Sequence, residues 1–331
     1  MKGMIAMQIS PIIGMALLVS AITAAPVAAQ VIGIGTNPQG SLYYSVGAAV
    51  AKVVQEKTGI QARVQPSAGS STYAPMIDRG ELELGFVNVQ DAENALKGID
   101  NFEGKPLPNL RLVGVMFSLP IGIAVPADSP AKSIRDLKGM LMPSDFPAQS
   151  TIVAIQDAVL ATGGISTKDM RRYPVQNYVK GMEALGDGKV DAALTGPGSG
   201  TSKEMDAKLS SRGGIRFISL DDTPQALAAM KAVFPGGYFD VLEPSPGMVG
   251  IAQPTRIMAY SAFLATGLKV SEEIVYKTTK TIFENKAELA TSSPTLSRFD
   301  PRRMVEKHLM PYHPGAIRYY TEAGVWPPND R

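Results

Sequence analysis

The stretch covering residues 31–44 constrains the fold of this chain more than any other part of the sequence. Residues 31–34 predict a short buried strand, and residues 35–40 predict a tight glycine loop in which Gly40 is free to take a positive φ. Ser41 then stands where a helix N-cap is expected, followed by apolar residues at helical spacing, Val46, Val50 and Val53. This arrangement can hold an anion or a polar group, because the loop and first-turn N–H groups point at it.

The glycine loop fits neither of two nucleotide-binding patterns. A dinucleotide site needs G-x-G-x-x-G, whereas the glycines here are Gly33, Gly35 and Gly40, so that the last comes too late. A P-loop ends in Gly-Lys-Ser/Thr, and no lysine occurs between residues 31 and 51. A plain strand-to-helix turn and a ligand-binding loop both remain open. The adjacent Tyr43 and Tyr44 favour a ligand, since a tyrosine offers an apolar wall and a hydroxyl; only one of them can face it.

The order of strand, polar loop and helix recurs along the first third of the chain. Residues 63–66 predict a second strand, followed by a loop at 67–72 and a helix over 74–79. Residues 82–87 predict a third strand, followed by a loop at 88–91 and a helix through 96. Strands that alternate with helices indicate a parallel sheet, in which the loops after the strands share one edge. We therefore expect the loops at 36–41, 67–72 and 88–91 to form one polar, weakly charged binding site.

The rest of the chain predicts a second lobe and a return to the first. Strands are expected at 110–117 and 121–125, with the crossing at 118–120, and strand–loop–helix units follow again from 141 onward. Residues 235–246 are expected to form a loop, 257–264 the returning strand, and 271–290 and 301–309 helices. The predicted fold class is α/β with two lobes and a hinge. The predicted domains are 30–118 with 243–331, and 119–242.

Composition excludes several classes of function. The formal net charge of the 331 residues is only +2, which gives no reason to expect nucleic acid as a partner. The chain has no cysteine and only two histidines, His308 and His313, so we expect no disulfide, no metal site and no cofactor. Both histidines lie far in sequence from the glycine loops, and no nucleophile–base pattern is present. We predict a protein that is not an enzyme, while an extracytoplasmic enzyme on the same fold remains an alternative.

The N-terminus predicts secretion. In residues 1–29 Lys2 is the only charged residue, 12–25 form an apolar run, and 27–29 are small residues that suit a cleavage site. A membrane anchor is the alternative, although it normally needs a longer apolar span. We expect residues 1–29 to be a signal peptide and the mature protein to be periplasmic.

Four motifs in this order resemble the TAXI family, the solute receptors of TRAP (tripartite ATP-independent periplasmic) transporters. They are the glycine-rich start at 35–51, residues 80–86, residues 188–193 and the closing residues 313–320, of which the last is the most specific. The resemblance covers about residues 31–324. It implies a two-lobe periplasmic-binding-protein fold of the second type, with a ligand enclosed between the lobes. It also implies a monomer that captures a small organic anion such as glutamate or a dicarboxylate by hinge closure, and delivers it to the TRAP membrane subunits.

The resemblance also implies the ligand-binding residues, matched position by position. They are Thr36, Ser41, Tyr43, Tyr44, Ser70, Ser71, Asn88 and Gln90 in the first lobe, and Ser150, Thr151, Thr195 and Gly196 in the second. Asp145 departs from the family pattern, and would repel an anion or accept an amine if it faced the cleft. Arg79, Arg171 and Arg256 are each able to clamp a carboxylate. A sensory or adaptor protein that signals to a membrane partner is the alternative function.

Overall fold

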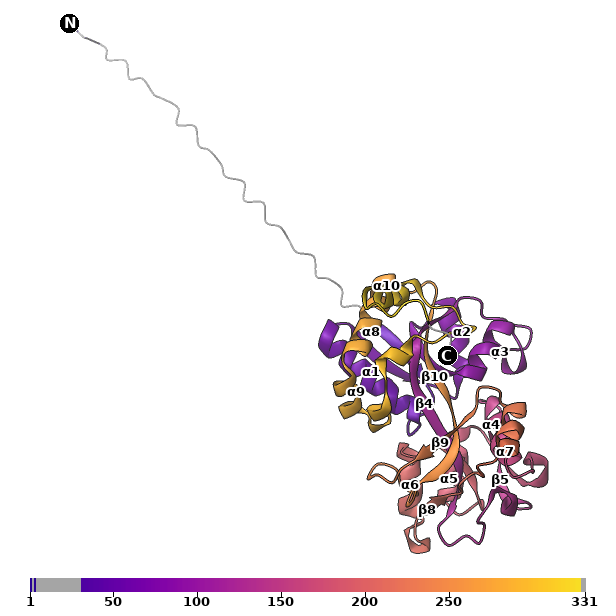
Figure 1. The fold of residues 1–331 in the computed structure, drawn as a ribbon. Coiled ribbons are helices and arrows are strands. Elements are labelled where there is room, and N and C mark those ends of the chain that lie inside the picture. Colours follow the sequence, from indigo (N-terminus) through magenta and orange to yellow (C-terminus); the bar gives the residue numbers. More distant parts are fainter. Residues whose placement is uncertain (2, 4–30, 329–331) are drawn as a thin grey trace.

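Two long strands join two α/β lobes in the computed structural model, which describes residues 31–328 together with Met1 and Gly3 (Figure 1). These strands are β4 (Leu110–Pro126) and β10 (Thr255–Gly267), and each runs through both lobes. The predicted signal peptide lies outside the described residues, except for Met1 and Gly3. Within the described part of the chain, no helix is long and apolar enough to cross a membrane.

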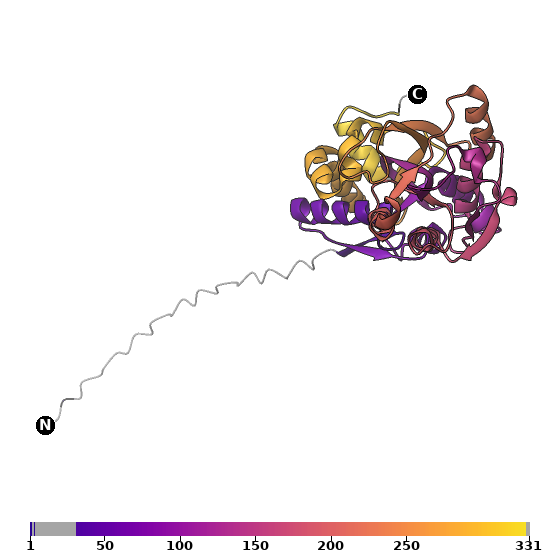
Figure 2. The ribbon, with the colours of Figure 1, turned by 90° about the horizontal axis from the view of Figure 1, so that it is seen from below.

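The first lobe is built from the two ends of the chain. Its N-terminal elements are β1 (Val31–Thr36), α1 (Leu42–Thr58), β2 (Gln61–Pro66), α2 (Ser70–Arg79), β3 (Leu84–Asn88), α3 (Val89–Lys97) and the 3₁₀ turn η1 (Asp100–Phe102). Its C-terminal elements are α8 (Glu272–Glu284), α9 (Lys286–Ser292), η5 (Pro294–Arg298), η6 (Pro301–Met304) and α10 (Pro314–Glu322). Seen from below, the orange and yellow C-terminal helices lie beside the indigo α1 (Figure 2).

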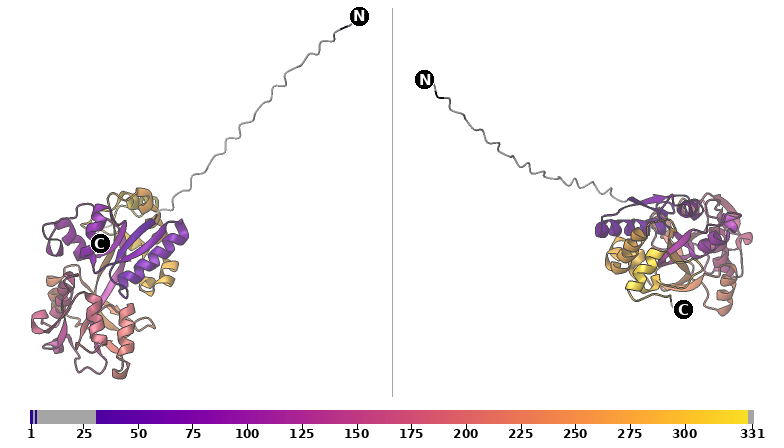
Figure 3. Two further views of the ribbon diagram at one scale, coloured as in Figure 1. Left: turned by 180° about the vertical axis from the view of Figure 1, so that it is seen from behind. Right: turned by 90° about the horizontal axis from the view of Figure 1, so that it is seen from above.

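The second lobe contains the middle of the chain, and the view from behind separates its helices from those of the first lobe (Figure 3). Its first elements are η2 (Ile134–Leu137), β5 (Leu141–Asp145), α4 (Thr151–Ala161), η3 (Thr167–Asp169), β6 (Arg171–Val175) and α5 (Tyr178–Gly186). They are followed by β7 (Ala193–Thr195), α6 (Gly200–Lys208), η4 (Ser210–Arg212), β8 (Ile215–Phe217), α7 (Pro224–Val233) and β9 (Tyr238–Leu242).

The sheet topology places the starts of several helices at one edge. The main sheet has the order β2-β1-β3-β10-β4-β7, with β8 also paired to β4 and β9 to β10. Strands β1, β2 and β3 are parallel, and β10 pairs antiparallel with both β3 and β4. The carboxyl ends of β1 and β3, and the helices that follow them, therefore face the junction of the lobes. This is the predicted two-lobe periplasmic-binding-protein fold.

The loop after β1 forms as its residue types predict. Gly40 has φ of +91°, a conformation that a residue with a side chain rarely adopts. The Ser41 hydroxyl accepts a hydrogen bond from the Tyr44 backbone N–H at 3.1 Å, so Ser41 is the predicted N-cap of α1. Tyr43 is buried against Phe86 and Phe117, at ring-centroid distances of 5.7 and 6.1 Å, and Tyr44 is only half-buried. The two tyrosines diverge as expected.

Several predicted elements are wrong because tertiary pairing overrides local signals. The strands predicted at 110–117 and 121–125 are one strand, β4, which continues through Pro120. Pro120 is opposite Ala259 of β10, and β7 pairs with β4 only from Gly122 onward, so one side of β4 has no partner strand at Pro120. A proline is tolerated at such a position. The loop predicted at 235–246 contains the strand β9, which is held by its pairing with β10.

Two predicted helices are shorter than expected, because side chains form hydrogen bonds with backbone groups that a longer helix would use. Asn285 separates α8 from α9, and its amide donates to the Thr281 carbonyl at 2.8 Å, which ends the single helix predicted at 271–290. The helix predicted at 301–309 is only the short η6, because the Tyr312 hydroxyl bonds the Met304 carbonyl and the Glu306 N–H. Helix α2 begins at Ser70, before the predicted start, and contains Pro75.

The domain boundaries stay predictions, with one observation that favours a shift. The Phe217 N–H donates to the Gly250 carbonyl, and the Leu220 N–H donates to the Arg256 carbonyl. Residues 243–256 therefore contact the second lobe, and we propose that the chain returns to the first lobe inside β10 rather than at 243.

His313 provides a test of the C-terminal helix. Its Nδ1 atom accepts from the Gly315 N–H at 3.1 Å and caps α10. We expect His313→Ala to be less stable than His313→Asn by about 0.5–2 kcal/mol, because asparagine can also cap a helix. Urea unfolding of the two variants measures this difference. Equal stabilities would mean that the cap contributes nothing.

Candidate functional site

A pocket lies at the junction of the lobes and is lined from both of them. It contains about 530 Å³ of space, counting the part that is open to solvent. Its polar lining residues are Asn37, Ser41, Ser70, Asn88, Asp91, Gln149 and Thr151. Its apolar and aromatic lining residues are Leu42, Tyr43, Leu119, Ile121, Ile152, Tyr178 and Tyr260.

Helix starts bring most of the polar residues to the pocket. Ser41 caps α1, Ser70 is the first residue of α2, and Thr151 is the first residue of α4. Asn88 ends β3 and caps α3, and its side chain accepts a hydrogen bond from the Asp91 N–H at 2.7 Å. The loop predicted at 88–91 is therefore wrong, because α3 follows β3 directly. Helix N-termini carry partial positive charge, and several of them point at one small volume.

Asp91 is the only charged side chain in the lining, and it is 3% exposed. Its Oδ2 accepts hydrogen bonds from the Ser70 hydroxyl and, at 2.8 Å, from the Asn88 amide. Its Oδ1 accepts from the Thr151 hydroxyl and, at 3.5 Å, from the Asn101 amide. Since Thr151 belongs to the second lobe, Asp91 connects the two lobes. None of the lining residues is a lysine, arginine or histidine.

Burial changes the protonation of this carboxyl. It raises the pKa of Asp91 above the usual value, although four side-chain hydrogen bonds oppose the shift by favouring the ionised form. The carboxylate is thus well hydrogen-bonded but still incompletely compensated for the loss of water. A positive charge beside it would remove this deficit.

Further contacts between the lobes surround the pocket. The Thr201 N–H of α6 donates to the Gly40 carbonyl at 3.2 Å. A Cβ on Gly236 would lie 2.6 Å from Cγ1 of Val89, and a Cβ on Gly69 would collide with the Ala148 carbonyl oxygen. The lobes therefore meet through close backbone approaches as well as through Asp91 and Thr151. The lobes are thus in direct contact around the pocket.

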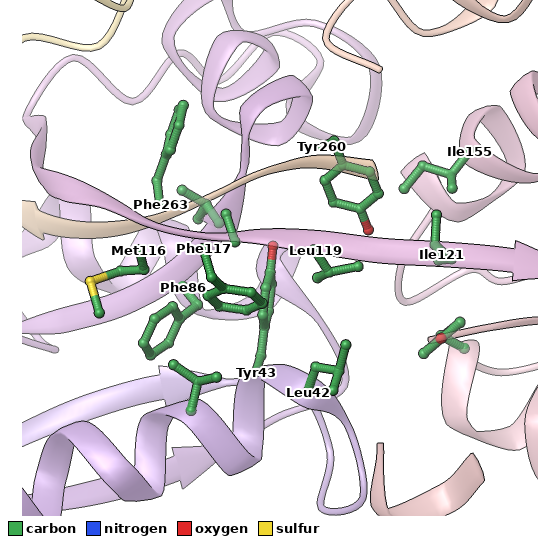
Figure 4. Packing of buried hydrophobic residues seen from close by; sticks show 14 of the residues in the cluster. Leu42, Tyr43, Phe86, Met116, Phe117, Leu119, Ile121, Ile155, Tyr260 and Phe263 are labelled. Carbon is green, nitrogen blue, oxygen red and sulfur yellow. The ribbon is translucent and has the colours of Figure 1, made fainter. Parts of the chain in front are cut away.

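Aromatic side chains form much of the remaining wall. Figure 4 shows Tyr43 and Tyr260 approaching the segment around Leu119, with both hydroxyl groups directed towards β4. The Tyr43 hydroxyl and Oδ1 of Asn37 are buried and have no hydrogen-bond partner. The backbone N–H of Tyr178 donates to Oε1 of Gln149 at 2.8 Å, which fixes the start of α5 against the pocket. Two residues of the lining therefore carry a polar atom that no protein group bonds.

The structure brings together five of the predicted ligand-binding residues. Ser41, Tyr43, Ser70, Asn88 and Thr151 line the pocket.

The remaining predicted residues lie elsewhere. Ser71, Gln90 and Ser150 line an outer groove between the lobes, which meets the pocket at Thr151. The hydroxyls of Thr36 and Thr195 donate to nearby backbone carbonyls, Tyr44 is outside the lining, and Gly196 packs behind Leu42 and Tyr178. Their roles as ligand-binding residues stay predictions.

The charged candidates from the sequence are all outside the pocket. Asp145 pairs with Arg172 and lines a separate hollow that also includes Arg171. Arg79 pairs with Glu81, and Arg256 pairs with Asp222. The sequence reasoning missed Asp91, although its spacing of three residues from Asn88 is that of a helix cap. In the part of the chain that the structure describes, no three His, Cys, Asp or Glu side chains are placed to hold a metal ion.

Comparison with known proteins identifies the family. A sequence model described as the NMT1-like family matches residues 34–324, which include every residue that lines the pocket. The chain belongs to the NMT1-like family. The TAXI assignment is finer than this match and stays a prediction.

Solved structures similar to this NMT1-like protein are distant. The alkanesulfonate-binding protein SsuA from Xanthomonas axonopodis pv. citri, bound to MOPS, is 16% identical with a TM-score of 0.49, over 83% of this chain and 81% of that one. A binding protein component of an ABC phosphonate transporter from Pseudomonas aeruginosa is 13% identical with a TM-score of 0.49, over 81% and 79%. The periplasmic aliphatic sulphonate binding protein SsuA from Escherichia coli is 16% identical with a TM-score of 0.42, over 81% of each. We base no argument on likenesses this distant.

The raised pKa of Asp91 predicts a pH-dependent stability. A carboxyl whose pKa is raised by folding holds its proton more tightly when folded, so its ionisation favours unfolding. The destabilisation begins near the unfolded pKa of about 3.9 and grows until the pH passes the folded pKa. We therefore expect Asp91→Asn to gain stability relative to the wild type as the pH rises above about 4, in thermal unfolding from pH 3 to 7.

Ser70→Ala is the matched control for this measurement. It keeps the carboxylate but removes a hydrogen bond that lowers the pKa of Asp91, so its stability should fall more steeply with pH than that of the wild type. A constant difference between Asp91→Asn and the wild type at every pH would contradict the assignment.

Proposed function

We propose that this protein is a periplasmic solute-binding receptor that captures a small solute between its lobes and delivers it to a membrane transporter. The observation that carries the proposal is the enclosed pocket whose lining comes from both lobes, with Thr151 of one lobe bonded to Asp91 of the other. A site shared in this way is completed only when the lobes close, so binding and closure are coupled.

The finer parts of the proposal rest on the motif resemblance. Delivery to TRAP membrane subunits is supported by residues 80–86, 188–193 and 313–320, which resemble the TAXI receptors. Secretion is supported by the predicted signal peptide. An organic anion as the solute gains no support from the pocket, because no basic side chain lines it. Hydroxyl groups and backbone N–H groups would have to hold such an anion beside Asp91.

A solute screen tests the receptor function. We expect one class among amino acids, dicarboxylates, 2-oxo acids, sugars and amines to raise the unfolding temperature of the purified protein. At 100 times its dissociation constant, a solute should add about 2.7 kcal/mol of stability. Isothermal titration checks each hit for one site per chain. If no class binds, the receptor function is wrong.

An engineered disulfide tests hinge closure. A Cβ on Gly236 would be 3.7 Å from Cβ of Val89, within the range of disulfide geometry, and the chain has no native cysteine. We expect oxidised Val89→Cys/Gly236→Cys to stay closed, and its reduced form, like the wild type without solute, to sample an open form with a larger radius of gyration in X-ray scattering.

The single variants Val89→Cys and Gly236→Cys are the controls, because neither can form a bridge within one chain. Identical scattering from the oxidised and reduced double variant would contradict hinge opening. A sensory protein would pass the same test, and transport of the solute by vesicles that contain the membrane subunits would distinguish the two functions.

A further inference from the structure

The pocket between the lobes is lined by an acidic side chain and by no basic one. Asp91 contributes a carboxylate, and no lining side chain is basic. Four side-chain hydrogen bonds hold both of its oxygens in place, from Ser70, Asn88, Thr151 and Asn101. The arginines that the sequence offered as anion clamps are outside the pocket. An anionic solute would therefore meet a like charge in a site that is largely shielded from water.

The positions that attract anions are already occupied. Ser70 and Thr151 begin α2 and α4, and Asp91 lies in the first turn of α3. The carboxylate thus sits where three helix N-termini converge, which is where a bound anion would be expected. The protein supplies this anion itself. The lining of the pocket supplies no positive charge to balance this carboxylate.

Two further atoms in the same pocket need a hydrogen-bond donor or can use one. Oδ1 of Asn37 is an acceptor without a partner, and the buried Tyr43 hydroxyl, in a side chain that is 4% exposed, also has none. An ammonium group has three donors and no acceptor. Both oxygens of Asp91 already accept two hydrogen bonds each, so an ammonium group would pair with this carboxylate through its charge and would donate to the two unpaired acceptors.

The rest of the lining suits the body of an organic cation. Tyr43, Tyr178 and Tyr260 present aromatic rings, which attract cations through their faces. Leu119 and Ile121 of β4 form an apolar surface against which a hydrocarbon chain or ring can pack. Figure 4 shows Tyr43, Tyr260 and Leu119 gathered at this point.

We infer that the solute is a small organic amine whose ammonium group is bound by Asp91, with Asn37 and Tyr43 as additional hydrogen-bond partners. This inference rests on the proposed receptor function and specifies the class of its solute. It replaces the organic anion that the motif resemblance implies.

Matched sets of probes test the charge directly. Tyramine, tyrosol and 4-hydroxyphenylacetate share an aromatic body and carry a cationic, a neutral and an anionic head. Isoamylamine, isoamyl alcohol and isovalerate form the corresponding aliphatic set. With the wild-type protein at pH 7, we expect the amine of at least one set to bind at least tenfold more tightly than its alcohol, and the acid to bind least, as measured by isothermal titration.

Variants assign the preference to Asp91. Asp91→Asn should reduce the preference for the amine over the alcohol to less than threefold, and Tyr43→Phe should weaken amine binding by a smaller factor. Asp145→Asn is the matched control, since Asp145 is an aspartate outside the pocket, and it should leave the preference unchanged. Circular dichroism checks that each variant is folded. The wild-type comparison stands even if Asp91→Asn does not fold.

The possible failures are distinguishable. Tighter binding of an acid than of its amine would overturn the inference but leave the receptor function intact. An amine preference that survives in folded Asp91→Asn would also overturn it. If no amine of either set binds, the inference is wrong, while the receptor function is judged separately by the wider solute screen and by scattering from the disulfide variant.

Discussion

The antiparallel pairing of β4 with β10 is the interaction on which the rest of the structure depends. These two strands are the long elements that pass through both lobes, and they are buried over most of their length. They also contribute Leu119, Ile121 and Tyr260 to the pocket. The connection between the lobes is therefore also one wall of the binding site, and a change in the angle between the lobes moves residues that an occupant touches. The register shifts near Phe263 and Ala265 give this pair places where the ladder is irregular and can bend.

Local physical chemistry predicts much of this fold. The glycine loop, the Ser41 cap and the valine spacing of α1 could be predicted because they depend on neighbours in sequence. Prediction failed at Pro120 and at β9, because a strand there is decided by its partner β10, which lies far away along the chain. It failed at 301–309 because the Tyr312 hydroxyl competes for the backbone.

The site was predictable only in part for the same reason. Ser41 was found from its position at a predicted helix start, whereas Ser70, Asn88 and Thr151 were matched through the resemblance to the TAXI receptors. Asp91 could not be distinguished from an ordinary acid in the first turn of a helix, because such acids are usually exposed and merely favourable to the helix dipole. Its carboxylate also bonds Thr151 of the other lobe, and no local pattern specifies that contact.

Asp91 links the contact between the lobes to the charge of the pocket, because the same carboxylate bonds Thr151 of the other lobe and is the charged group of the lining. Closing the lobes removes water from this carboxylate, and the hydroxyl of Thr151 replaces part of that lost hydration. Its other hydrogen-bond partners, Ser70, Asn88 and Asn101, belong to the same lobe as Asp91. The surroundings of this carboxylate are consequently supplied by both lobes and not by either lobe alone.

The backbone contacts between the lobes have a consequence for how the protein can change. At Gly69 and Gly236 the lobes approach so closely that a single methyl group would act as a wedge between them, although neither glycine lines the pocket. At Gly69 the added group would also collide with Gln149, which lines the pocket, but at Gly236 it would collide with Val89, which does not. Replacing Gly236 would therefore oppose the close approach of the lobes without a clash at any pocket residue. The affinity of such a protein could drift over generations through sites that never touch the solute, independently of its chemical selectivity.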